Sequence, residues 1–188
     1  MKKNIAVVGC GYWGKNLVRN FYELGALYSV SDVNSETANS YANQYQVKNL
    51  TVDQTINDEN IEGVVLTVPA KLHASMAIEA MKKGKHIFVE KPLALNEMDA
   101  KLMIETAKEN KVKLMVGHLL HYHPIFKEIK KIVKEGQIGK LEYIQSNRLS
   151  FGKFRSEEDV IWSFAPHDIS MILALANEKP KIVKCNSK

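Results

Sequence analysis

The stretch from Ile5 to Gly14, IAVVGCGYWG, decides the fold of this chain. Four apolar residues, typical of a buried strand, run into a G-x-G-x-x-G loop, and residues 13–24 then have the pattern of a helix that ends at Gly25. Such glycines allow a tight turn, a close approach of the backbone to a pyrophosphate, and close packing of helix on strand. The helix N-terminus also favours an anion. We therefore expect a dinucleotide to bind here, at Gly9, Gly11, Tyr12, Trp13 and Gly14.

Asp32 ends the next expected strand, residues 27–32. A carboxylate at this place can accept hydrogen bonds from both hydroxyls of the adenosine ribose and repels a 2′-phosphate, which favours NAD over NADP. The alternative is that Asp32 only caps the following helix, for which Ser35 is the expected N-cap and 36–45 the expected range.

Strand and helix patterns continue to alternate up to about residue 120, which predicts an α/β fold: a doubly wound parallel sheet of the Rossmann type over residues 1–120. The further elements expected there are strands at 64–68, 86–90 and 112–117 and helices at 72–83 and 97–110, with Asn96 as the cap of the last helix. Residues 121–188 predict the start of a second α/β domain that stops early, with helices at 125–134 and 167–176 and strands at 141–149 and 181–185.

Composition excludes several classes of protein. The chain has 188 residues, 45% of them hydrophobic and 25% charged, which is typical of a globular domain rather than a disordered chain. Its two cysteines exclude a disulfide scaffold and fit a reducing compartment. The net charge of +5 comes from scattered lysines, read as a solvated face rather than a nucleic-acid surface. No apolar run reaches membrane-spanning length, so we expect a cytoplasmic protein with no nucleic-acid or membrane partner.

Glu90-Lys91-Pro92 follows the expected strand at 86–90. Ligands of open α/β sheets bind beyond the carboxyl ends of the strands, which places Glu90 at the cofactor and Lys91 near its nicotinamide. A lysine there can bond a substrate hydroxyl and assist removal of its proton. The alternative is a surface lysine before a proline.

Together with Gly117 and Ala165-Pro166-His167-Asp168, these motifs resemble the glucose–fructose oxidoreductase/inositol dehydrogenase (Gfo/Idh/MocA) family. The resemblance implies a Rossmann domain followed by an α/β domain with an open sheet, and oxidation or reduction of sugar or cyclitol carbons with NAD or NADP. It implies that Lys91 and His167 are catalytic and that the Lys91–Pro92 bond is cis. For a full-length form we expect a homo-oligomer.

Two departures from the family pattern stand out. Ser163 occupies the place, four residues before His167, where the family often has an aspartate, so the acid/base role rests more on Lys91. The chain is also about half as long as family members, which predicts a fragment or a truncated relative that binds cofactor with little dehydrogenase activity.

Two clusters bear on the substrate. His118, His121 and His123 precede Pro124, and no carboxylate shares a ligand-like spacing with them. We therefore expect these histidines to line the substrate cleft rather than to bind a metal. His121 occupies the position where the family usually has an arginine. Asn147 and Arg148, with Lys153 and Arg155, suit a diphosphate or carboxylate, or form a solvated loop.

Residues 147–149 and 162–168 are most similar to family members that oxidise C3 of nucleotide-linked 2-acetamido-glucuronate, such as UDP-2-acetamido-2-deoxy-glucuronate. The resulting hypothesis is an NAD-dependent oxidoreductase with substrate at Lys91, His121, Asn147, Arg148 and His167. The alternatives are a dehydrogenase of a free sugar or inositol, and a non-catalytic NAD-binding fragment.

Overall fold

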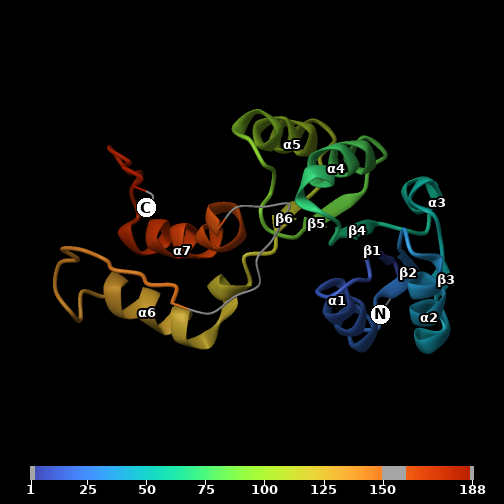
Figure 1. Cartoon of the computed structure of the whole chain (residues 1–188), viewed down its shortest axis with the longest axis horizontal. Coiled ribbons are helices and arrows are strands. Elements are labelled where there is room, and N and C mark those ends of the chain that lie inside the picture. The colour runs from blue at the N-terminus through green and yellow to red at the C-terminus, as the bar shows by residue number, and fades with distance from the viewer. Residues whose placement is uncertain (1–2, 150–159, 187–188) are drawn as a thin grey trace. The chain divides into compact units, whose positions relative to one another are not determined.

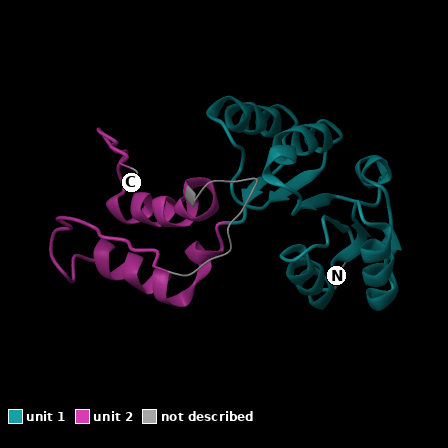
Figure 2. Cartoon of the chain, in the orientation of Figure 1, with its two compact units in different colours: residues 1–117 teal, residues 118–188 magenta. Residues whose placement is uncertain are grey.

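The chain forms two compact units, residues 1–117 and 118–188, shown in two colours in Figure 2. In the computed structural model, residues 3–149 and 160–186 are described. Lys153 and Arg155 of the expected anion-binding loop lie outside the described residues.

Unit 1 is built on a six-stranded parallel sheet with the order β3-β2-β1-β4-β5-β6 (Figure 1). This arrangement is the doubly wound Rossmann type predicted from the alternating pattern. Strands β1 to β3 follow one another toward one edge of the sheet, and β4 to β6 follow one another toward the other edge. The topological switch point therefore lies between the neighbouring strands β1 and β4. The strands are β1 (Ile5–Val8), β2 (Leu27–Ser31), β3 (Lys48–Asn49), β4 (Gly63–Leu66), β5 (His86–Val89) and β6 (Leu114–Val116).

Helices cover the sheet of unit 1, and three of them, α2, α3 and α5, begin at polar caps. The α2 cap is Asn34, whose side chain accepts a hydrogen bond from the Thr37 amide, so the prediction that Ser35 caps this helix is wrong by one residue. Asn96 caps α5 as predicted, by accepting from the Asp99 amide. A 3₁₀ turn precedes α4. The ranges are α1 (Gly14–Glu23), α2 (Ser35–Tyr45), α3 (Val52–Asn57), η1 (Ala70–Leu72), α4 (His73–Lys82) and α5 (Glu97–Glu109).

The core of unit 1 lies on both faces of the sheet because alternate strand residues point to opposite sides. Val7 and Val65 face one cluster, which includes Val18 of α1 and Ala42 of α2. Their neighbours in the strands face the other cluster, against α4 and α5: Ala6, Val8, Val64 and Leu66 pack with Ala77, Met81 and Met103. The continuous apolar runs of β1 and β4 are therefore buried on both sides, as a parallel sheet requires.

The described part of unit 2 consists of η2 (Leu119–Tyr122), α6 (Pro124–Lys134) and α7 (Val160–Ala176). The strands predicted at 141–149 and 181–185 are absent from these described residues. An alternating sequence becomes a strand only where another strand supplies hydrogen-bond partners, and the described part of this unit contains none. Helix α7 begins seven residues before the predicted start, and Pro166 lies inside it. Within the described residues, no helix combines the length and apolarity needed to cross a membrane.

Candidate cofactor and catalytic site

The motif residues of unit 1 stand in one row along the carboxyl edge of the sheet. Val8 is the register partner of both Ser31 and Leu66, Leu66 pairs with Val89, and Val89 pairs with Val116. Each of these five residues ends its strand, so the residues that follow them are neighbours at that edge. In the order of the strands, this row is Asp32, Gly9, Thr67, Glu90 and Gly117.

The glycine loop is tightly fitted at two of its three glycines. A Cβ on Gly14 would lie 1.9 Å from the Gly9 carbonyl oxygen, and Gly9, with φ +92°, has the Thr67 carbonyl 2.8 Å from its Cβ position. Thr67 holds the loop by donating from its hydroxyl to the carbonyls of Val8 and Gly9. Gly11 differs, because its Cβ position has no chain atom within 4 Å. Its open face is where a pyrophosphate would approach the backbone.

Asp32 joins this loop to the end of β2. Its Oδ2 accepts a hydrogen bond from the Cys10 amide at 2.6 Å, and its Oδ1 accepts from the Asn34 amide at 2.8 Å. An ionised carboxylate has about four acceptor positions, so the two amides leave capacity for ribose hydroxyls. Asn34, not Asp32, caps α2, and the Asp32 carboxylate joins the Cys10 amide of the loop to the amide of that cap residue.

Cys10 is a buried filler of the loop. Burial, assisted by the negative charge of Asp32, raises the pKa of its thiol to about 12. Cys10 therefore has the character of a small loop-filling residue rather than of a reactive thiolate.

Two hollows lie beside the loop, and the chemistry of one of them fits the adenosine half of a dinucleotide. One, of about 510 Å³, has apolar walls and the Asp32 carboxylate at its edge; it is lined in part by Gly9, Gly11, Val33, Val52, Leu72 and Met76. Apolar walls beside a carboxylate suit an adenine ring and its ribose. The other, of about 550 Å³, is more polar and lies between the loop and α2, with Tyr12, Lys15 and Thr37 in its lining.

The turn Glu90-Lys91-Pro92 leaves β5 at the same edge, with a cis Lys91–Pro92 bond as the resemblance implied. Glu90 Oε1 accepts a hydrogen bond from Trp13 Nε1 at 2.8 Å, and the same carboxylate packs against Gly117, where a Cβ would lie 2.7 Å from Oε1. Burial raises the pKa of Glu90, and the Trp13 N–H partly opposes that shift. Glu90 thus links the glycine loop to the turn that carries Lys91.

His73 is a site residue that sequence reasoning missed. It starts α4, is 1% exposed, and bridges the carbonyls of Pro92 and Val68, at 2.7 Å from Nδ1 and 2.9 Å from Nε2. Its position in the sequence could have identified it: His73 lies on the apolar stripe of α4, one turn before Ala77 and two turns before Ala80 and Met81. A polar residue in a buried stripe needs hydrogen-bond partners.

In unit 2 the structure brings His167 together with two of the three clustered histidines. The rings of His118 and His167 lie 6.2 Å apart between centroids in an edge-to-face arrangement, and His118 lies 6.0 Å from His121. Burial lowers the pKa of His121, and the charge of Lys130 lowers it further. His123 instead caps α6 by accepting from the Ile125 amide. Among residues 3–149 and 160–186, no group of three such side chains is arranged to hold a metal ion.

Arg148 is paired with the residue after His167. Its Nε lies 2.6 Å from Asp168 Oδ2, and the Ser146 hydroxyl donates to Oδ1 of the same carboxylate at 2.7 Å. Burial alone would raise the pKa of Asp168, but these two hydrogen bonds and the charge of Arg148 lower it. The structure does not bring Asn147 into this cluster, and Lys91 and His167 belong to different units.

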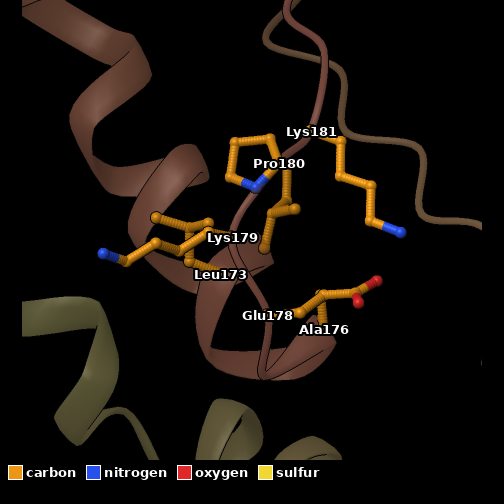
Figure 3. A pocket seen from close by; sticks show the side chains of 7 residues that line it. Leu173, Ala176, Glu178, Lys179, Pro180 and Lys181 are labelled. Atoms are coloured by element: carbon orange, nitrogen blue, oxygen red, sulfur yellow. The ribbon is translucent and has the colours of Figure 1, made fainter.

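A separate hollow of about 340 Å³ follows the end of α7 (Figure 3). Its walls come from a single short segment, and its charged side chains, Glu178, Lys179 and Lys181, point in different directions. It contains none of the motif residues.

A parallel sheet with a glycine loop at its switch point, an acidic residue at the end of β2 and a lysine turn after β5 define an oxidoreductase with a dinucleotide-binding Rossmann domain. Residues 3–118 match the model of the oxidoreductase family with an NAD-binding Rossmann fold, Gfo/Idh/MocA. The chain belongs to that family.

Relatives differ in the reaction that their names state. The chain is 29% identical to 2,7-anhydro-N-acetylneuraminate hydratase of Escherichia coli, over 96% of this chain and 51% of that protein. It is 28% identical to UDP-N-acetylglucosamine 3-dehydrogenase of Acidithiobacillus ferrooxidans, over 95% and 56%. It is 34% identical to scyllo-inositol 2-dehydrogenase (NAD(+)) of Bacillus subtilis, over 73% and 42%.

A solved structure of the A. ferrooxidans enzyme superposes with a TM-score of 0.85 at 27% identity, covering 95% of this chain and 58% of that one. The chain therefore spans about half the length of these relatives.

Proposed function

We propose that the protein is an NAD-dependent dehydrogenase that transfers hydride between nicotinamide and C3 of a sugar nucleotide such as UDP-2-acetamido-2-deoxy-glucuronate. The observation that carries the proposal is the row of motif residues at one edge of the sheet. It gathers a pyrophosphate loop, a ribose-binding carboxylate and the lysine turn at the switch point, where such cofactors bind.

The cofactor assignment depends on the fit of the loop. Gly9, Gly11 and Gly14 bind the pyrophosphate, Tyr12 and Trp13 flank it, and Asp32 accepts the ribose hydroxyls. The same carboxylate repels a 2′-phosphate, so NAD is preferred to NADP. When bound, nicotinamide supplies the acceptor for the hydride.

The chain supplies the acid/base chemistry. Lys91 bonds the reacting hydroxyl and takes its proton as the hydride leaves the carbon. His167 is the second catalytic group at that hydroxyl. Ser163, one turn earlier in α7, is 5% exposed and carries no charge, so it cannot stabilise an imidazolium as a carboxylate would.

The sugar-nucleotide substrate is supported by the similarity to UDP-N-acetylglucosamine 3-dehydrogenase, which extends over 95% of the chain and so includes unit 2. Arg148 and Asn147 would bind the anionic part of the substrate, with His121 lining the cleft. Because Asp168 holds Nε of Arg148, this arginine offers a fixed and partly neutralised cation rather than a mobile one.

A free cyclitol is the second candidate substrate. It is favoured by the 34% identity to scyllo-inositol 2-dehydrogenase (NAD(+)), which is confined to about three quarters of the chain. Such a substrate has no diphosphate, so activity on it would be insensitive to Arg148.

The test is NADH formation with UDP-2-acetamido-2-deoxy-glucuronate, UDP-N-acetylglucosamine, scyllo-inositol and free sugars, on this chain and on a full-length form. We expect Lys91→Ala to abolish turnover and to leave NAD binding intact, whereas Lys113→Ala, a matched charge removal elsewhere in unit 1, leaves both unchanged. Wild-type kcat in Lys91→Ala, or NAD binding without turnover on any substrate, would refute the proposed function.

A further inference from the structure

The turn that carries Lys91 is held on both sides of this residue. On the side of residue 90, the Glu90 carboxylate accepts from the Trp13 indole and lies against Gly117. On the side of residue 92, the carbonyl of Pro92 lies 2.7 Å from Nδ1 of His73. The short backbone segment from Glu90 to Pro92 is therefore held at both ends, and Lys91 lies between these ends.

The hydrogen-bond chemistry of His73 is constrained by its partners. Nδ1 faces the Pro92 carbonyl and Nε2 faces the Val68 carbonyl, both within hydrogen-bond distance. A carbonyl oxygen only accepts, so each contact is a hydrogen bond only where the facing ring nitrogen carries a hydrogen. The Nδ1 contact is the shorter of the two, and His73 is only 1% exposed to water, so we assign the ring hydrogen to Nδ1.

We propose, resting on the proposed function, that His73 is a positioning residue for Lys91: its buried ring lies between the Pro92 and Val68 carbonyls, donates to the Pro92 carbonyl through Nδ1, and so fixes the turn from which the lysine reaches the substrate. Val68 follows β4 and Pro92 follows β5, so the ring also locks the exits of two adjacent strands. His73 does not touch the substrate or the cofactor in this role.

The first test is NMR of the 188-residue chain labelled with ¹⁵N-histidine, with the His73 signals identified by their loss in His73→Gln. At pH 7.5 we expect Nδ1 of His73, which faces the Pro92 carbonyl, to carry a hydrogen. An unprotonated Nδ1 would overturn the proposal.

The second test compares ¹⁵N relaxation of the Lys91 and Leu93 amides in variants. We expect the order parameters of these two amides to fall in His73→Ala. They should fall less in His73→Gln, because the glutamine amide group can still donate a hydrogen bond. Met81→Ala on the same helix is the control, because Met81 is fully buried and lies on the same stripe but is two turns away. Equal disorder of the turn in Met81→Ala would overturn the specific role of His73.

The third test is kinetic. In His73→Ala we expect kcat to fall about 100-fold, the cost of a misplaced catalytic group, with less than about a twofold change in the Kd of NAD. An unchanged kcat would overturn the proposal. These kinetics are measured in a full-length form, where an absence of turnover in the wild type, with the NMR results as expected, would instead refute the proposed function and leave the hydrogen bonding of His73 established.

Discussion

The indole nitrogen of Trp13 lies 2.8 Å from Oε1 of Glu90 and donates a hydrogen bond to it. Trp13 precedes α1 in the glycine loop, whereas Glu90 precedes Lys91 in the sequence. One hydrogen bond thus connects the glycine loop, the proposed dinucleotide site, to the turn that carries Lys91, the proposed catalytic lysine.

Trp13→Phe should raise the pKa of Glu90 further above its ordinary value. Burial already favours the neutral acid, and the variant removes an N–H that stabilises the carboxylate. The measurement is a ¹³C NMR titration of the Glu90 carboxyl carbon, with Trp162→Phe as the control. Equal pKa values of Glu90 in the wild type and in Trp13→Phe would show that the hydrogen bond from Trp13 does not stabilise the Glu90 carboxylate.

Gly11→Ala should separate folding from cofactor binding. A methyl group at this position meets no chain atom within 4 Å, so the free energy of unfolding should change by less than about 0.5 kcal/mol. The same methyl blocks the approach of a pyrophosphate, and we expect NAD binding to weaken at least about tenfold. Calorimetric titration and thermal unfolding measure the two effects.

Gly14→Ala is the matched variant. Its methyl group would lie 1.9 Å from the Gly9 carbonyl, so unfolding should become easier by about 1–3 kcal/mol or more. If Gly11→Ala unfolds as readily as Gly14→Ala, the open face assigned to Gly11 is wrong.

Asp32→Ala should narrow the preference for NAD over NADP about tenfold, or 1.4 kcal/mol. It should also destabilise the protein by about 1–3 kcal/mol without unfolding it, because two backbone amides lose a charged acceptor. Titration of both cofactors tests this. Asn34→Ala, which removes the α2 cap, should cost about 1 kcal/mol of stability and leave the preference unchanged. NADP binding as tight as NAD binding in the wild type would contradict the role of Asp32.

Arg148→Ala should weaken unit 2 only while Asp168 is ionised. The folded-state pKa of Asp168 lies below its ordinary 3.8, so the pair's contribution is present above about pH 3.8 and is lost as the pH falls through the folded-state pKa. Because the Arg148 side chain is 41% exposed, we expect about 0.5 kcal/mol at neutral pH. Urea unfolding followed by Trp162 fluorescence in a Trp13→Phe background measures it. Lys140→Ala controls for charge, and a pH-independent difference would count against the pair.

The row of motif residues could be predicted from the sequence because each member directly follows a strand, and parallel strands end at the same edge. This rule and the spacing of the motifs were enough to predict the positions of Gly9, Asp32, Glu90 and Lys91. The single-residue error at Asn34 arose because asparagine and serine are equally good caps, and only the backbone decides between neighbours.

Other features depend on contacts between distant residues, which no local pattern contains. His73 bonds to Pro92, 19 positions away, and Arg148 bonds to Asp168, 20 positions away. The sequence identified Arg148 as a cation near the substrate but could not predict its pairing. Residues 141–149 alternate like a strand, yet strand formation depends on a partner and not on alternation alone.

The position of β1 has a consequence for the order of folding. Within this chain β1 precedes both of its neighbours in the sheet, and these are synthesised at very different times: residues 27–31 soon after it, and residues 63–66 only after two further helices. During this interval one edge of β1 is an unpaired, wholly apolar strand edge, the kind of surface that pairs with other chains. We expect the nascent chain to be most aggregation-prone, and most in need of a chaperone, after β2 has emerged from the ribosome and before β4 does.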